Sequence, residues 1–127
     1  MNPYYIFKFV PLSVLQMLAR FVARVILRLP NASIMRTVSI NMALIAPSLS
    51  ERQKQALTKD IIYHQCLTSI ESIKSWAMPP EWSIAQIRDV YNKDILLEGL
   101  ANPNGMVAIV PHLATWEMMN AWLNQFG

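Results

Sequence analysis

The stretch from Phe9 to Leu29 constrains this chain most, because it is apolar except at five positions. At about 100° per residue, those five positions fall on one narrow face of a helix and leave a continuous apolar arc. This arc is wider than a helix needs for packing against one neighbour. The polar positions are Ser13, Gln16, Arg20, Arg24 and Arg28.

Residues 1–30 are therefore predicted to form an N-terminal membrane-associated helix. A cleaved signal peptide is disfavoured, because its basic residues would precede the apolar core. A spanning helix is also disfavoured, because each arginine at mid-membrane costs roughly 2.5–3.5 kcal/mol. A helix that dips into one leaflet, with its arginines at the cytoplasmic headgroups, fits better. The alternative is an amphipathic helix packed on a soluble core.

Charge is divided unevenly along the 127 residues. Residues 1–50 hold five bases and no acid, whereas residues 51–127 hold six bases and eight acids, so the net charges are +5 and −2. The basic character belongs to the apolar N-terminal part, where it suits anionic lipid headgroups better than nucleic acid. Cys66 is the single cysteine, which excludes an internal disulfide, and we interpret it as a small core residue.

Two further helices are expected next. The first runs from Ile34 to Ile45, with Asn31 or Ser33 as its cap, and ends before a proline. The second opens at Ser50-Glu-Arg-Gln53, which has the spacing of a capping box, and continues to about Met78. Two consecutive prolines then stop it.

The pattern of residues after the two prolines predicts an α/β fold class. We expect a short strand at Ile87–Val90, a helix at Asp94–Ala101 and a turn at Asn102–Gly105. Met106–Val110 is an unbroken apolar run with β-branched residues, typical of a buried strand in a mostly parallel, helix-covered sheet. A helix capped by Thr115 would follow.

His112 and Glu117 are the candidate catalytic residues. His112 would lie just past the carboxyl end of a strand, where α/β proteins place ligands. Glu117, in the first helical turn, could orient one imidazole nitrogen while the other accepts a proton from a substrate alcohol. The alternative is a capping or buried histidine beside a glutamate that favours the helix dipole. His64 is interpreted as structural, and no metal-ligand cluster or phosphate loop indicates a metal or cofactor.

The segment His112-Leu-Ala-Thr-Trp-Glu117 resembles the His-(x)4-Asp/Glu motif of glycerolipid acyltransferases. With Trp116 before the acid, it is similar to the late acyltransferases of lipid A biosynthesis. Arg36-Thr-Val-Ser-Ile-Asn41 leading to Ala46-Pro47 agrees with that resemblance. The family often has Gly-Asn where this chain has Ala114-Thr115.

The resemblance implies transfer of an acyl group from an acyl carrier protein thioester to a hydroxyl of a lipid A precursor, at the cytoplasmic face of the bacterial inner membrane. His112 would be the general base and Glu117 its orienting partner. Family members run on for over a hundred further residues, so residues 31–127 are expected to be a helical segment and the truncated start of an acyltransferase α/β domain, inactive alone. The alternative function is a small membrane-associated interaction protein without catalysis.

Overall fold

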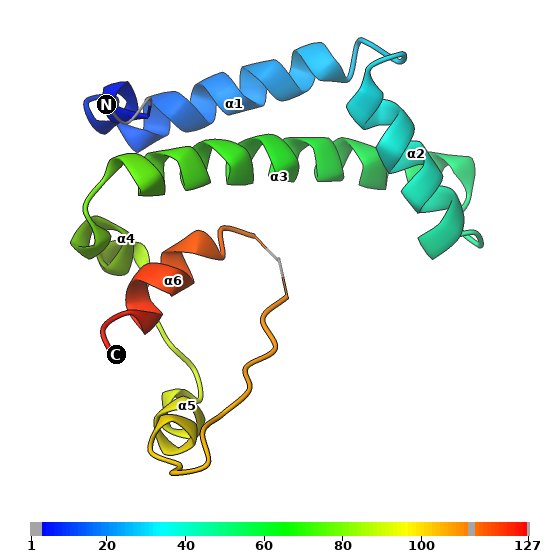
Figure 1. The fold of residues 1–127 in the computed structure, drawn as a ribbon. Coiled ribbons are helices and arrows are strands. Elements are labelled where there is room, and N and C mark those ends of the chain that lie inside the picture. The colour runs from blue at the N-terminus through cyan, green and yellow to red at the C-terminus, as the bar shows by residue number, and fades with distance from the viewer. Residues whose placement is uncertain (1–3, 112–113, 127) are drawn as a thin grey trace.

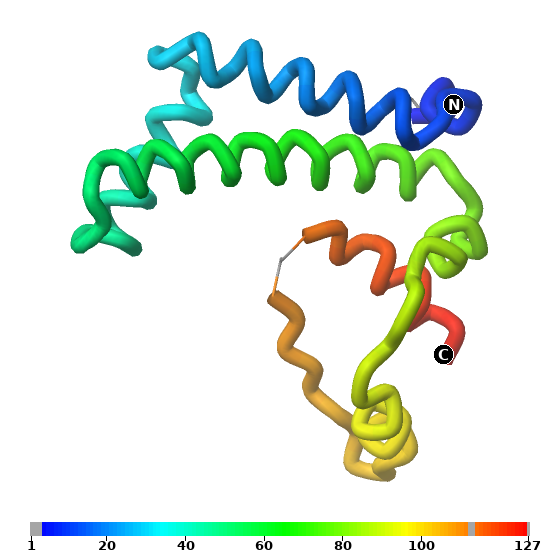
Figure 2. The backbone as a smooth tube through the Cα atoms, turned by 180° about the vertical axis from the view of Figure 1, so that it is seen from behind, coloured from blue at the N-terminus to red at the C-terminus, as the bar shows by residue number. Residues whose placement is uncertain are grey.

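The computed structural model describes residues 4–111 and 114–126, and the regular elements within them are helical (Figure 1). Helices α1 and α3 lie side by side in opposite directions, and α2 crosses one end of α3. Helix α4 follows the other end of α3, while α6 and, further out, α5 lie on the side of α3 that faces away from α1 (Figure 1 and Figure 2). The elements are η1 (Tyr5–Lys8), α1 (Leu12–Ile26), α2 (Ser33–Ile45), α3 (Glu51–Ala77), α4 (Pro80–Gln86), α5 (Lys93–Leu100) and α6 (Glu117–Leu123).

A stripe of one leucine and two alanines packs α1 against α3. Leu15, Ala19 and Ala23 are buried and recur every four positions, so they form one stripe on α1. Ala23 also joins a core cluster that includes the fully buried Ile62 of α3. Val38 and Met42 of α2 complete this cluster. The core of the molecule therefore lies where α1, α2 and α3 meet.

The boundaries of α2 and α3 follow local sequence signals. The prediction for α3 is confirmed, because the backbone N–H of Gln53 donates to Ser50 Oγ at 3.4 Å and that of Ser50 donates to Gln53 Oε1 at 3.0 Å. The helix at Ile34–Ile45 is confirmed, but its predicted cap is wrong. Ala32 occupies the cap position without a side-chain hydrogen bond.

Lys74 anchors the N-terminal segment to α3. Its Nζ donates to the carbonyl oxygens of Phe7, Lys8 and Val10 at 2.9, 3.0 and 2.9 Å. The side chain is only 4% exposed. Burial lowers the pKa of the Lys74 ammonium, while three carbonyl acceptors favour its charged form. The residues before α1 are thus held by one buried cation.

The α/β expectation is wrong for the part of the chain that the structure describes. Neither Ile87–Val90 nor Met106–Val110 forms a strand there, and Val107 and Ile109 are 92% and 93% exposed. A strand needs a neighbouring strand to accept and donate its backbone hydrogen bonds, and composition alone supplies none. Figure 2 shows the segment after α5 running back toward α3 by itself. The helix near Asp94 and the turn at Asn102–Gly105 are confirmed, with the Gly105 N–H donating to the Asn102 carbonyl at 2.9 Å.

The N-terminal helix is shorter than the apolar stretch that predicted it. Pro11 precedes its first residue, and α1 ends at Ile26, before a turn that leads to Pro30. In residues 4–111 and 114–126, no helix combines the length and apolar character that crossing a membrane requires.

Candidate active site

The predicted motif falls at the junction between the extended segment and α6. His112 and Leu113 lie outside the described residues. Glu117 is the first residue of α6, as the sequence predicted for a first-turn acid. A carboxylate at this end of a helix is favoured by the backbone N–H groups that lack helical partners.

The backbone turns sharply just before α6. Ala114 has φ +51°, in the left-handed region that glycine adopts without steric cost. Trp116, not Thr115, occupies the N-cap position of α6, and no side-chain bond caps the helix there, so the predicted role of Thr115 is wrong. The Oγ1 of Thr115 instead donates to Oε2 of Glu71 on α3 at 2.7 Å. A hydrogen bond to a carboxylate is stronger than one to a neutral acceptor.

An open groove of about 840 Å³ lies between α3 and the start of α6, where Ala114, Trp116 and Glu117 line it. Hydroxyl groups line its α3 side, and the aromatic rings of Trp76 and Trp116 contribute apolar surface. Its lining residues are Ile61, His64, Gln65, Thr68, Ser69, Ser72, Ile73, Trp76, Ala114, Trp116 and Glu117. A groove with apolar walls and a few polar groups is the usual form of a ligand site.

Glu117 carries an unsatisfied oxygen beside this groove. Its Oε2 is buried and has no hydrogen-bond partner among the described residues. A buried polar atom without a partner costs about 1–3 kcal/mol, and more when it is charged. The arrangement therefore suits a proton donor that meets this carboxylate, such as an imidazole N–H.

The structure adds two residues that the sequence did not single out for function. His64, interpreted as structural, lies on the groove with Glu117. Glu71 accepts hydrogen bonds from Thr115 and, at 2.8 Å, from Gln16 Nε2 of α1. Helical spacing places both residues on α3, but it does not show which distant segment they meet. Gln16, a polar residue one position after the buried Leu15 of α1, was the available signal for a polar partner.

No three His, Cys, Asp or Glu residues gather as a metal site would require within residues 4–111 and 114–126. Cys66 is half-buried, and burial raises the pKa of its thiol, which lowers the fraction of reactive thiolate.

Comparison with known protein families shows to which family the chain belongs. The family described as bacterial lipid A biosynthesis acyltransferase matches residues 4–127. The chain belongs to this family. No curated protein and no solved structure gives a significant match.

Family membership confirms the resemblance that the segment 112–117 indicated. The bacterial lipid A biosynthesis acyltransferase match spans the groove, Glu71 and the complete segment 112–117. The family implies an acyltransferase-type function with a lipid A-type acceptor. The described part of the chain is nevertheless helical, so the family assignment holds although the predicted sheet is wrong there.

Proposed function

We propose that this chain supplies the catalytic residues for transfer of an acyl group from an acyl carrier protein thioester to a hydroxyl of a lipid A precursor. In this proposal His112 is the general base and Glu117 is its orienting partner. The observation that supports it best is the buried, unsatisfied Oε2 of Glu117 at the start of α6. In this proposal the imidazole N–H of His112, five residues earlier in the chain, donates a hydrogen bond to this oxygen.

The chemistry needs no nucleophile from the protein. His112 accepts the proton of the substrate hydroxyl as its oxygen attacks the thioester carbonyl carbon. The carbon–sulfur bond then breaks, and the thiol of the carrier leaves with a proton returned by the imidazolium. Glu117 keeps the ring in the tautomer that leaves the accepting nitrogen free and stabilises the imidazolium.

The test compares His112→Ala and Glu117→Ala with unchanged protein in a transfer assay on the full-length gene product. Each substitution should reduce transfer at least about a hundredfold, because a positioned general base contributes about 10²–10⁴-fold. The double variant should be little slower than either single one, because the two residues act as a unit.

Glu98→Ala is the matched control, since Glu98 is an exposed glutamate of α5 away from the groove. Circular dichroism and membrane yield check that each variant is folded. Near-normal transfer by folded His112→Ala protein would remove the catalytic assignment. Absence of transfer from the unchanged gene product, with membrane binding retained, would favour the non-catalytic interaction protein.

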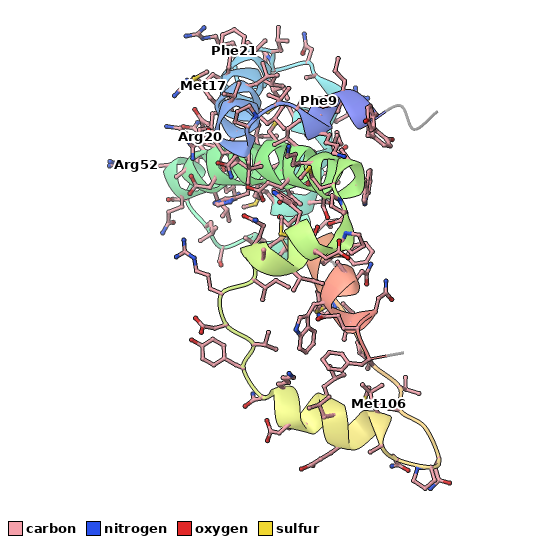
Figure 3. The ribbon with its side chains drawn as sticks, turned by 90° about the vertical axis from the view of Figure 1, so that its left-hand side faces the viewer. Phe9, Met17, Arg20, Phe21, Arg52 and Met106 are labelled. Carbon is pink, nitrogen blue, oxygen red and sulfur yellow. The ribbon has the colours of Figure 1, made fainter. Side chains whose placement is uncertain are left out.

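We further propose that α1 lies on the cytoplasmic face of the bacterial inner membrane. Met17, Leu18 and Phe21 are 63%, 51% and 59% exposed, although they are large and apolar. Figure 3 shows Met17 and Phe21 on the side of α1 that faces away from α3, with Arg20 on the flank. An apolar face beside basic side chains is the pattern of a helix that lies in the headgroup region.

Vesicle flotation tests this orientation with Met17→Asp and Phe21→Asp. Point substitutions are preferable to deleting α1, because deletion would also remove Ala23 from the core. On vesicles containing anionic lipid, each should weaken binding by at least about tenfold. Ile95→Asp is the control, because Ile95 is similarly exposed, at 64%, on α5. Equal flotation of all three variants would contradict the orientation.

A further inference from the structure

Glu71 joins three parts of the molecule that are distant in sequence. Its Oε1 accepts from Gln16 Nε2 of α1 at 2.8 Å, and its Oε2 accepts from Thr115 Oγ1 at 2.7 Å. Both bonds are partly buried. Each carboxylate oxygen thus has a donor of its own, and the two bonds fix the plane of the carboxylate.

Thr115 lies where the chain enters α6, so its bond to Glu71 attaches the start of α6 to α3. It follows Ala114, where the backbone takes its left-handed turn, and it comes two residues before Glu117. Its hydroxyl makes no capping bond to α6, so the side chain is committed to α3. The bond between Thr115 and Glu71 therefore fixes how the chain enters α6, next to the groove residues Ala114, Trp116 and Glu117.

Gln16 adds a second constraint from the opposite side. It lies on α1, which packs along α3 through the buried Leu15 and Ala19. A carboxylate held only by Thr115 could rotate toward water, whereas one held from both sides has little freedom. The helix proposed to lie at the membrane is in this way connected to the segment that carries Glu117.

We propose that Glu71 is a positioning residue for acyl transfer. It holds Thr115, and with it residues 114–117, in the orientation that places Glu117 for its role, while Gln16 orients the Glu71 carboxylate. This inference rests on the proposed function for its catalytic consequence. Its structural part, the attachment of residues 114–117 to α3, is measurable without any turnover.

The experiment compares Glu71→Ala, Glu71→Gln, Thr115→Val and Thr115→Ser. Glutamine keeps an acceptor for Thr115, and Gln16 can reverse its amide to meet the new NH₂ group. Valine preserves the shape of threonine without the hydroxyl, and serine preserves the hydroxyl. Glu98→Ala is the control for loss of a glutamate elsewhere.

Amide hydrogen exchange over residues 114–126 is the first measurement. Glu71→Ala and Thr115→Val should each accelerate exchange there by about tenfold or more, because each removes a bond to a charged group. Glu71→Gln and Thr115→Ser should remain within about threefold of the unchanged protein. Exchange in α2, which is distant from Glu71, should not change in any variant. Unchanged exchange at 114–126 in Glu71→Ala would overturn the proposal.

Steady-state transfer is the second measurement. Misplacement by about 1 Å can cost about a hundredfold, so Glu71→Ala and Thr115→Val should lower kcat by about ten- to a hundredfold, with KM for the carrier thioester within about threefold. Glu71→Gln and Thr115→Ser should restore most of kcat. Faster exchange with unchanged kcat would overturn the positioning role. If the unchanged protein transfers no acyl group, the proposed function fails, and hydrogen exchange alone decides whether Glu71 holds the segment.

Discussion

The three N-terminal helices and the residues after α4 differ in how they are stabilised. The core cluster of buried apolar residues, Ala23, Val38, Met42 and Ile62, lies wholly in α1, α2 and α3. No described residue from 87 onward is buried. The first region is held by packing that many buried residues share. The second is held by half-buried or exposed contacts, among them Lys93 Nζ over the rings of Trp122 and Phe126 and the bond of Thr115 to Glu71.

This difference indicates in which region substitutions of side chains lower the stability of the molecule. Close-packed side chains lose stability when any one is shortened, because a cavity remains. An exposed segment loses almost nothing when an apolar side chain is removed, yet a single polar contact can determine its position. We therefore expect stability to be governed by the first region, and orientation of the candidate site by individual bonds in the second.

The largest contrast should come from the same substitution in both regions. Ile62→Ala should lower the free energy of unfolding by about 2–5 kcal/mol, because Ile62 is fully buried and its truncation leaves a cavity. Ile109→Ala should change it by less than about 0.5 kcal/mol, because Ile109 is 93% exposed. Urea denaturation followed by circular dichroism measures both. Equal losses would show that the two regions share one core and would break the comparison.

An intermediate effect is expected at the buried cation of the first region. Lys74→Met keeps the aliphatic stem but leaves the carbonyls of Phe7, Lys8 and Val10 without their donor. The expected loss is about 1–3 kcal/mol in the free energy of unfolding. Limited proteolysis should also cleave earlier within residues 4–11. Lys59→Met is the control, because Lys59 is an exposed lysine of the same helix, α3. Identical digestion of the two variants would show that Lys74 does not anchor this segment.

The smallest effect should be a gain of stability in the second region. Ala114→Gly should raise the free energy of unfolding by about 0.5–1 kcal/mol, because relief of the left-handed backbone exceeds the entropy that glycine adds to the unfolded chain. Ala101→Gly is the control, since Ala101 has φ −77° and should gain nothing. Thermal unfolding measures both variants. A loss of stability in Ala114→Gly would mean that the turn is not strained.

Much of the helical structure could be predicted from the sequence because its causes are local. The capping box at Ser50, the helix stop before Pro47 and the turn at Asn102–Gly105 each depend on residues within a few positions. The candidate site could be predicted only in part. Glu117 lies at the start of α6 as expected, while the contribution of Glu71 depends on a partner 44 residues away.

The sequence by itself determined where helices α1, α2, α3 and α5 lie, and it indicated the family through the segment 112–117. Tertiary structure decided that α1 buries its small residues Ala19 and Ala23, leaving Phe21 outside, and that Val107 and Ile109 stay exposed instead of entering a sheet. It also decided that Thr115 bonds to α3 rather than capping α6. The physical reason is that helical hydrogen bonds join residues four apart, whereas strand pairing and side-chain contacts need a distant partner brought close by packing.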